Sequence, residues 1–200
     1  MTILYGIDLL GTMVFSISGA MAANRSGIDI FGATFTGFVT AIGGGSLRDV
    51  FLNLRPVWVD DSNYLVAILI GVIVSIIANR QLYRLARTLT FFDALGIGFF
   101  CVVGVQKSLN YESSQTAAII LGVFSAVMGG VIRDTLMNET PLIFRKEIYA
   151  TACLTGAITY ITFWSWNVDT TVNAFVSTLT ISAIRLVAVK YKLSLPGIGG

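Results

Sequence analysis

The sequence contains an internal repeat in which residues 8–76 are matched, without a gap, by residues 93–161. Aligning each position with the one 85 residues later gives 20 identities in 69 positions. Composition alone would give roughly five or six, so we infer that the two segments are copies of one unit. The identities include paired glycines, charged residues, prolines and tyrosines: Asp8 and Asp93, Gly19 and Gly104, Gly44-Gly45 and Gly129-Gly130, Arg48-Asp49 and Arg133-Asp134, Pro56 and Pro141, and Tyr64 and Tyr149.

Each copy holds enough apolar sequence for three membrane-spanning helices, which is an odd number. A three-helix unit that is followed directly by its copy must enter the membrane the second time from the opposite side. The repeat therefore predicts an all-α membrane protein that contains two inverted three-helix repeats. This arrangement is typical of secondary transporters and related channels.

Composition supports a location in the bilayer, because 55% of the residues are hydrophobic, 12% are charged and the mean hydropathy is +0.80. A helix needs roughly 20 apolar residues to cross a hydrocarbon core of about 30 Å. We therefore predict seven transmembrane helices, at about 3–22, 30–53, 62–79, 89–107, 115–138, 147–165 and 171–189. They form a single transmembrane domain over residues 1–200, with repeat one at about 1–80, repeat two at about 86–166 and a seventh helix at about 171–189.

The distribution of basic residues predicts the direction of the chain, because cytoplasmic loops collect Lys and Arg. If the N-terminus lies outside, only Arg55 and Lys107 fall on the outer side. The inner side then holds eight basic residues: Arg25, Arg80, Arg84, Arg87, Arg145, Lys146, Lys190 and Lys192. We therefore expect an outside N-terminus and a cytoplasmic C-terminus. The net charge of +2 reports this orientation and gives no reason to expect a nucleic-acid partner.

The second and fifth predicted helices are unusual, because consecutive glycines lie in the middle of each span. These are Gly43, Gly44 and Gly45 in the first repeat and Gly129 and Gly130 in the second. Consecutive glycines permit a kink that frees backbone carbonyls, which are tolerated in a membrane only inside protein or beside water. We therefore expect a pore or binding role at these hinges. The alternative is that the glycines simply let neighbouring helices approach closely.

An Arg-Asp pair follows each glycine segment, at Arg48-Asp49 and at Arg133-Asp134. Adjacent helical side chains point about 100° apart, so we expect their partners to lie elsewhere. Twofold symmetry suggests crosswise pairs, Arg48 with Asp134 and Arg133 with Asp49. Charges within spans usually mark ion or substrate pathways, although a structural clasp or snorkelling to the interface are alternatives.

Three further charged residues are candidates for a role at the ends of the pathway. Asp8 and Asp93 lie early in the first and fourth helices and are candidate mouth carboxylates, although stabilisation by the helix dipole is the simpler interpretation. Lys107 breaks the symmetry, because its counterpart is Ala22. It either snorkels from the end of the fourth helix, which we favour, or reaches into a conduction path.

Nothing in the sequence suggests catalysis or a cofactor. Histidine is absent, and the two cysteines, Cys101 and Cys153, lie within apolar segments, so we expect no metal site and no disulfide framework. The four intramembrane aspartates provide no hydrolase signature. We therefore expect a protein that is not an enzyme and that needs no cofactor.

The chain resembles the prokaryotic members of the trimeric intracellular cation channels, known as TRIC. The resemblance rests on the two Gly-Gly-x-x-Arg-Asp segments, on Pro56 and Pro141 after them, on Lys107 and on the segment from Arg185 to Pro196. It implies a multi-pass protein of the prokaryotic inner (cell) membrane that forms a homotrimer among membrane lipids. Each subunit would hold its own pore, lined by kinked helices two and five, that conducts monovalent cations such as potassium and sodium.

The resemblance leaves the cargo open, because the family also includes bacterial proteins regarded as transporters of a small amino acid such as glycine. The triple glycine of the first repeat becomes Met128-Gly129-Gly130 in the second, which suggests that the two kinks differ. Because Arg48 and Arg133 would repel cations unless neutralised, we expect them to brace or gate the pore, together with Asp49, Asp134 and Lys107.

Overall fold

The computed structural model describes residues 3–82, 86–145 and 147–194, and all of its regular structure is helical. The described residues form eight α-helices and one short 3-10 helix: α1 (Ile3–Arg25), α2 (Ile30–Phe51), α3 (Val57–Asp60), α4 (Asn63–Leu82), α5 (Ala86–Asn110), α6 (Gln115–Leu136), η1 (Leu142–Phe144), α7 (Ala150–Ser165) and α8 (Thr170–Tyr191). Polar caps start three of them. The side chains of Asp29, Ser114 and Asp169 accept hydrogen bonds from the first-turn amides of α2, α6 and α8.

The 85-residue repeat is visible in the structure, because α2 and α6 begin and end at positions 85 residues apart. After each helix, an asparagine turns the chain at a positive φ, 56° at Asn53 and 55° at Asn138. Pro56 and Pro141 then start α3 and η1 as their N-cap residues. The prolines thus precede the next short helix, and the asparagines turn the chain just after the long helices end.

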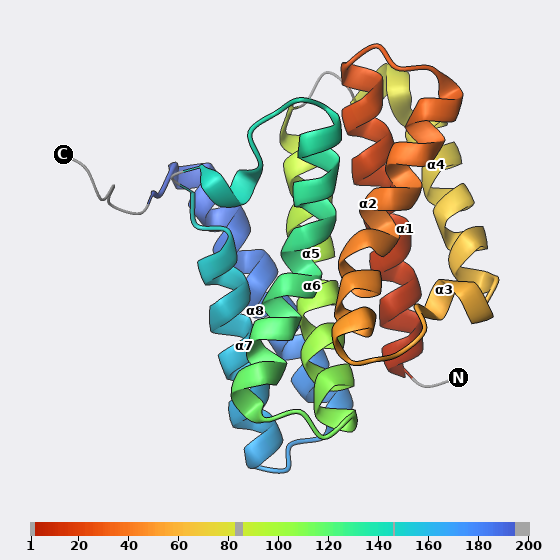
Figure 1. Ribbon diagram of the computed structural model, residues 1–200. Coiled ribbons are helices and arrows are strands. Elements are labelled where there is room, and N and C mark those ends of the chain that lie inside the picture. Colours follow the sequence, from red (N-terminus) through yellow and green to blue (C-terminus); the bar gives the residue numbers. More distant parts are fainter. Residues whose placement is uncertain (1–2, 83–85, 146, 195–200) are drawn as a thin grey trace.

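The two repeats are inverted relative to each other. Figure 1 shows α3 and η1, which are 85 residues apart in sequence, at opposite ends of the molecule. The start of α1 and the end of α8 also lie at opposite ends, as an odd number of long helices requires. Three basic residues of the predicted inner side lie at the end of the molecule that holds η1. Arg25 ends α1, Arg145 follows η1, and Lys190 lies in the last turn of α8. Arg84 and Lys146, which also belong to the predicted inner side, lie outside the described residues.

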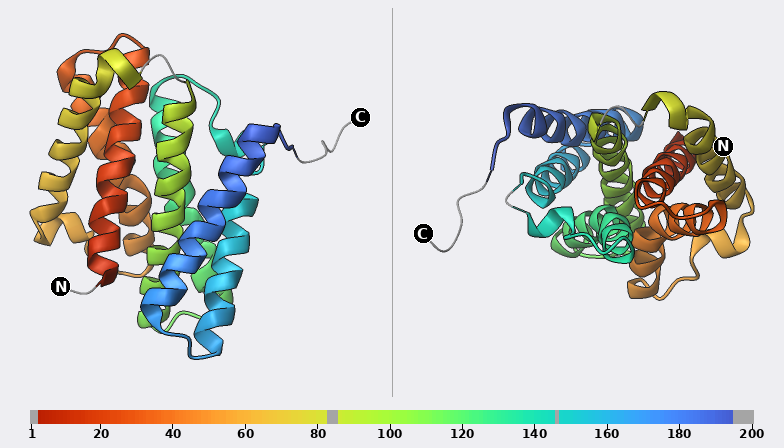
Figure 2. Two further views of the ribbon diagram at one scale, coloured as in Figure 1. Left: turned by 180° about the vertical axis from the view of Figure 1, so that it is seen from behind. Right: turned by 90° about the horizontal axis from the view of Figure 1, so that it is seen from above.

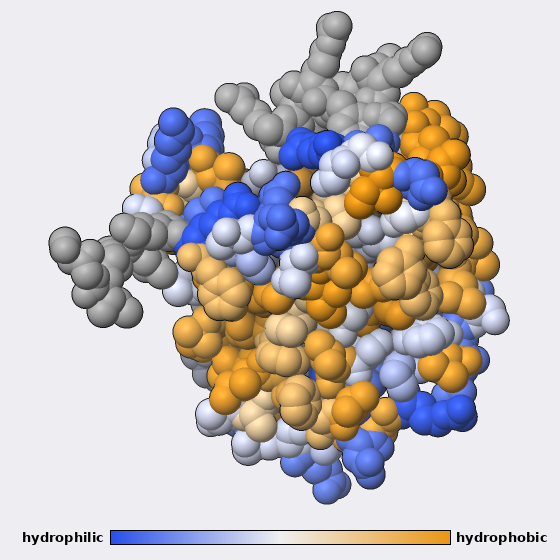
Figure 3. All heavy atoms as spheres, turned by 45° about the horizontal axis from the view of Figure 1, so that its top comes forward, coloured by the Kyte–Doolittle hydropathy of each residue, from blue (hydrophilic) through white to orange (hydrophobic). Residues whose placement is uncertain are grey.

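Five of the described helices are long and apolar enough to cross a membrane: α1, α2, α5, α6 and α8. The described apolar part of α4, Asn63–Ile77, is shorter, and α7 has 16 residues. Large apolar side chains are exposed along these helices, as at Phe31 and Ile77, which are 80% and 77% exposed. Figure 3 shows apolar side chains over much of the body and polar ones gathered toward its ends. The chain is therefore a multi-pass membrane protein.

The two repeats lie side by side, with α1, α2 and α4 on one side and α5, α6 and α7 on the other (Figure 2). The halves meet through α1, α2, α5 and α6, while α8 packs against α5 and α7. Buried apolar side chains such as Phe15, Phe100 and Ile97 fill the space between the halves. The intramembrane charges are placed on these same central helices.

Candidate functional site

The glycine segments lie where α2 and α6 cross. A methyl group on Gly44 would collide with the backbone carbonyl of Ser125, and one on Gly129 would collide with the backbone carbonyl of Thr40. Thr40 and Ser125 are themselves 85 residues apart, so the crossing is symmetric. These two glycines therefore permit close helix packing, which was the simpler alternative.

The expected helix breaks are not found in this conformation. Both helices stay α-helical through their glycine segments, and no described residue of either segment has a positive φ. The expectation of freed carbonyls was therefore wrong, because tertiary packing holds the helix hydrogen bonds together despite the glycines. Unlike Gly44 and Gly129, which face the other helix, Gly45 and Gly130 face polar side chains of the site. A methyl group on Gly130 would lie 3.0 Å from Tyr149 Oη, and one on Gly45 would lie 3.8 Å from Arg48 Nη2.

The first group of charged residues, which we call the Arg48 cluster, contains Asp8, Arg48, Asp49, Tyr64 and Lys107. Arg48 donates from Nε and Nη2 to Asp49 Oδ1, at 2.9 and 2.7 Å. Lys107 Nζ lies 2.9 Å from the same oxygen. Asp8 Oδ2 accepts a hydrogen bond of 2.7 Å from the Tyr64 hydroxyl. Arg48 and Asp49 are buried, with side chains 1% and 0% exposed.

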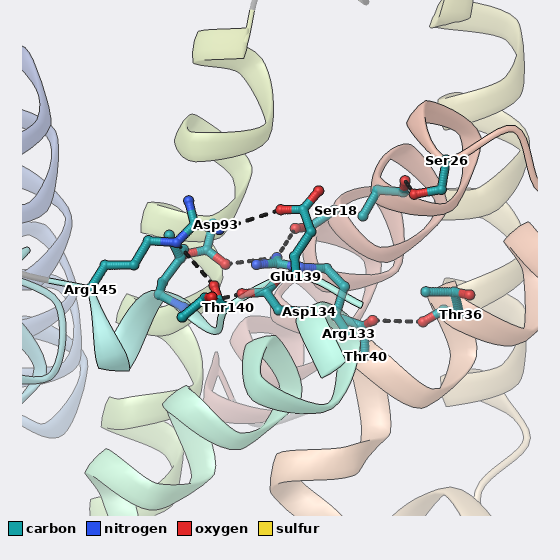
Figure 4. Close-up of polar contacts among 12 residues, drawn as sticks. Ser18, Ser26, Thr36, Thr40, Asp93, Arg133, Asp134, Glu139, Thr140 and Arg145 are labelled. Atoms are coloured by element: carbon teal, nitrogen blue, oxygen red, sulfur yellow. Dashed lines mark hydrogen bonds and ion pairs between the residues drawn. The ribbon is translucent and has the colours of Figure 1, made fainter. Parts of the chain in front are cut away.

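The second group, the Arg133 cluster, contains Ser18, Asp93, Arg133, Asp134 and Tyr149. Arg133 Nε donates to Asp134 Oδ1 at 2.8 Å, while Nη1 donates to Asp93 Oδ1 at 2.8 Å and to Ser18 Oγ at 2.6 Å. Figure 4 shows the guanidinium of Arg133 between Asp93 of α5 and Ser18 of α1. Asp134 Oδ2 also accepts from the backbone amide of Leu142. The two clusters lie toward opposite ends of the molecule, since α2 and α6 run in opposite directions.

The expected crosswise pairs are wrong. Each arginine pairs with the aspartate that follows it, because the long side chain curls back to reach its neighbour. The antiparallel crossing places Gly44 beside Ser125, so Arg48 and Asp134 are separated by about thirteen residues along the helices. At a rise of 1.5 Å per residue this is ~20 Å, far too long for an ion pair.

The structure also corrects the expectations for Asp8, Asp93 and Lys107. Neither aspartate is an open mouth carboxylate, because Asp8 is 8% exposed and Asp93 is 1% exposed. Lys107 does not snorkel to the interface but turns inward to Asp49, so it braces the site. Charged pairs at this depth are held by several hydrogen bonds, which offsets part of the cost of burying them.

Sequence reasoning missed Ser18, Tyr64 and Tyr149 as site residues. Tyr64 and Tyr149 were recognisable only as a repeated identity, which signals a shared structural need without naming the partner. Arg185 of α8 faces protein, because Nη2 donates to Glu147 Oε2 at 2.6 Å and the guanidinium lies 5.0 Å from the Tyr149 ring centre.

A small cavity adjoins the Arg48 cluster. Its lining includes the polar residues Asp8, Thr12 and Arg48, the glycine Gly45, and the aromatic residues Trp58 and Phe100. The space open to the centre of a water-sized sphere is about 20 Å³. A single water molecule needs roughly 10–15 Å³ by this measure. The cavity is thus wide enough for water or a small ion and too small for a larger organic ligand in this conformation.

Known proteins share the two-repeat organisation of this chain. A protein-family model described as "Glycine transporter" matches residues 5–80 and again residues 90–165, which are the two repeats. The chain is 41% identical to a UPF0126 membrane protein of Vibrio cholerae over 98% of its own length and 82% of the relative. It is 39% identical to the UPF0126 inner membrane protein YadS of Escherichia coli over 97% and 95%.

Superposition on solved structures identifies the family to which the chain belongs. The TRIC trimeric intracellular cation channel orthologue from Rhodobacter sphaeroides superposes with a TM-score of 0.90 at 31% identity, covering 96% of this chain and all of that one. The chain belongs to the prokaryotic TRIC family. A second prokaryotic TRIC channel, crystallised in 0.5 M KCl, superposes with a TM-score of 0.87 at 28% identity, covering 96% and 98%. These structures confirm the resemblance to prokaryotic TRIC channels that the sequence of this chain indicated.

Proposed function

We propose that this protein is a cation channel whose pathway runs between α1, α2, α5 and α6. One observation carries the proposal: two buried charge clusters, related by the repeat, lie toward opposite ends of the same α2–α6 crossing. Charged side chains at membrane depth are costly and usually mark a path for ions or substrate. Helices α2 and α6 line this path, with Gly45 and Gly130 on its wall.

The charge balance of the clusters supports monovalent cations such as potassium and sodium. In formal charges, the Arg48 cluster holds two carboxylates and two cationic side chains, while the Arg133 cluster holds two carboxylates and one guanidinium. The small negative excess attracts a cation without binding it tightly. Conduction needs such weak binding, because an ion must also leave.

We assign the arginines and their partners a bracing or gating role. Arg48 and Arg133 are each held by carboxylates, so their charge is neutralised and they do not form the selective wall. Asp49, Asp134 and Lys107 complete these braces. The glycines at the crossing bring the backbones of the two helices into direct contact, so a movement of one helix is transmitted to the other.

The proposed assembly is a homotrimer in the prokaryotic inner membrane, with one pore in each subunit. All seven long helices, including α4 and α7, would span the bilayer, with the N-terminus outside and the C-terminus in the cytoplasm. The apolar exterior supports contact with lipid and with neighbouring copies.

Two experiments test this arrangement. Light scattering of the purified protein tests the trimer. Labelling of Ser26→Cys and Val59→Cys from each side of vesicles tests the orientation, in protein whose buried Cys101 and Cys153 are replaced by alanine.

Reconstitution of the purified protein tests the proposed activity. In planar bilayers with a potassium gradient, we expect currents that reverse near the potassium equilibrium potential. Uptake of labelled glycine into vesicles is measured on the same preparation, because the matching family model is described as a glycine transporter. Saturable glycine uptake without current would overturn the channel proposal and establish the transporter. Currents without uptake support the channel.

A further inference from the structure

The two clusters differ in the bonds made by two equivalent aspartates, Asp8 of α1 and Asp93 of α5. In the Arg48 cluster, Asp8 accepts a hydrogen bond from Tyr64, and Arg48 donates to Asp49 without an ion pair to Asp8. In the Arg133 cluster, the equivalent Asp93 is paired with Arg133 at 2.8 Å. The equivalent tyrosine, Tyr149, has no hydrogen-bond partner for its buried hydroxyl among the described residues. Equivalent residues thus make different bonds.

Within the two clusters, four buried groups without partners are the repeat counterparts of groups that are bonded in the other half. They are Arg48 Nη1, Asp49 Oδ2, Asp93 Oδ2 and Tyr149 Oη. Their counterparts make bonds: Arg133 Nη1 to Asp93 and Ser18, Asp134 Oδ2 to the amide of Leu142, and Asp8 Oδ2 to Tyr64 Oη. A buried polar group without a partner is costly and calls for an explanation.

We propose that the protein has a second conformation in which the two repeats exchange these bonding patterns. In it, Arg48 pairs with Asp8 and releases Tyr64, while Tyr149 donates to Asp93 in place of Arg133. The second conformation requires no new kind of contact, since each half adopts bonds that the other half makes in this structure. In transporters built from inverted repeats, alternating access is largely a rigid-body movement of one repeat against the other.

The helix crossing couples the two halves. Gly44 and Gly129 bring the backbones of α2 and α6 into direct contact, so the two helices move as one packed unit. Because Arg48 and Arg133 lie on these helices at opposite ends, a shift that carries Arg48 toward Asp8 withdraws Arg133 from Asp93. Packed interfaces favour two discrete arrangements over a continuous deformation.

Ser18 explains why the present arrangement is favoured. Its hydroxyl accepts a 2.6 Å hydrogen bond from Arg133, whereas its repeat counterpart is Val103, which offers no such bond to Arg48. The exchanged conformation loses this contact and gains no equivalent. The exchange goes beyond the proposed function, because it concerns the conformation of the chain and does not depend on which cargo passes.

Nuclear magnetic resonance of the full-length protein in lipid nanodiscs tests the exchange directly. Tyrosine labelled with ¹³C at Cζ reports whether a hydroxyl donates a hydrogen bond, and single Tyr→Phe variants assign the signals. Tyr64→Phe removes the bond to Asp8, so we expect the Tyr149 signal to move to the position of a hydrogen-bonded phenol. Tyr160→Phe, a buried tyrosine of α7 outside both clusters, is the matched control and should leave Tyr149 unchanged.

Ser18→Val gives a second, independent test by making the two repeats alike at this position. Loss of one hydrogen bond to a charged group should raise the population of the exchanged conformation about tenfold. The Tyr64 and Tyr149 signals should then shift together, in opposite senses. An unchanged Tyr149 signal in folded Tyr64→Phe protein, or a shift of only one tyrosine in Ser18→Val, overturns the proposal. Neither result depends on transport, so failure of the channel proposal is separately visible.

Discussion

The ammonium group of Lys107 in α5 lies 2.9 Å from Oδ1 of Asp49 in α2. This oxygen also accepts both hydrogen bonds from Arg48, so one carboxylate is held by two cationic side chains. The first repeat has no equivalent lysine, since Ala22 occupies that position. The contact therefore makes the Arg48 cluster formally neutral and leaves the Arg133 cluster one charge more negative.

Replacement of Lys107 should change conduction mainly through the charge of the Arg48 cluster, because Arg48 still holds Asp49. Lys107→Ala, the residue of the other repeat, makes the Arg48 cluster formally negative, so we expect potassium conductance at low salt to rise severalfold. The gain should disappear near 1 M salt, where the Debye length falls to about 3 Å. Lys107→Arg retains the charge and is the matched control. Single-channel recording at both salt concentrations measures the effect, and a conductance that falls in Lys107→Ala contradicts it.

The glycines should differ sharply in their tolerance of alanine. A methyl group at Gly44 collides with the Ser125 carbonyl, so Gly44→Ala should lower the free energy of unfolding by about 3 kcal/mol or more. At Gly45 the nearest atom is 3.8 Å away, so Gly45→Ala should be neutral or stabilising by up to about 1 kcal/mol. Unfolding of both variants in the same detergent measures the difference. Equal effects would show that the close crossing of α2 and α6 is absent in the detergent-solubilised protein.

Much of the fold was predictable because the signals are local or repeated. The start of α2 follows from Asp29 as its cap, and the predicted spans 30–53 and 115–138 agree with Ile30–Phe51 and Gln115–Leu136 to within two residues. The inversion follows from the odd number of helices per copy. Such features depend on periodicity and capping, which a single sequence displays.

The bonding within the site was not predictable in the same way. Recurrence identified Arg48, Asp49, Arg133 and Asp134 as site residues, but their partners depend on where two antiparallel helices touch. That register is set by the contact of Gly44 with the carbonyl oxygen of Ser125, and the sequence shows the glycine without showing which carbonyl it meets. The same holds for Lys107, whose direction depends on the distance between α5 and α2.

A polar contact near the start of α1 predicts a local pH dependence. The Tyr5 hydroxyl donates a 2.6 Å hydrogen bond to Asp61, which precedes α4, and this bond lowers the pKa of Asp61 below its usual range. A lowered pKa in the folded state adds stability that is complete above the usual pKa and is lost as pH falls through the lowered value. Tyr5→Phe should therefore raise the pKa of Asp61. Carboxyl ¹³C titration of both proteins measures it, and identical titrations would rule out the bond.

Arg133 should be the most sensitive position of the site, because its removal leaves Asp93 and Asp134 buried without their cation. We expect Arg133→Met to cost about 3–5 kcal/mol in the free energy of unfolding. The matched control is Arg145→Met, which breaks an exposed 3.4 Å pair with Glu139 and should cost less than about 1 kcal/mol.

A double-mutant cycle separates the Arg133–Asp93 pair from other effects of these substitutions. Asp93→Asn alone leaves Arg133 paired with Asp134 and bonded to Ser18, so its cost should be smaller than that of Arg133→Met. In the double variant one unpaired carboxylate is gone, so the combined cost should fall short of the sum by about 2 kcal/mol. Chemical unfolding of all four proteins in one detergent gives this coupling energy. Additive costs would mean that the 2.8 Å contact contributes nothing in the membrane protein, and that Asp134 and Ser18 alone hold the guanidinium.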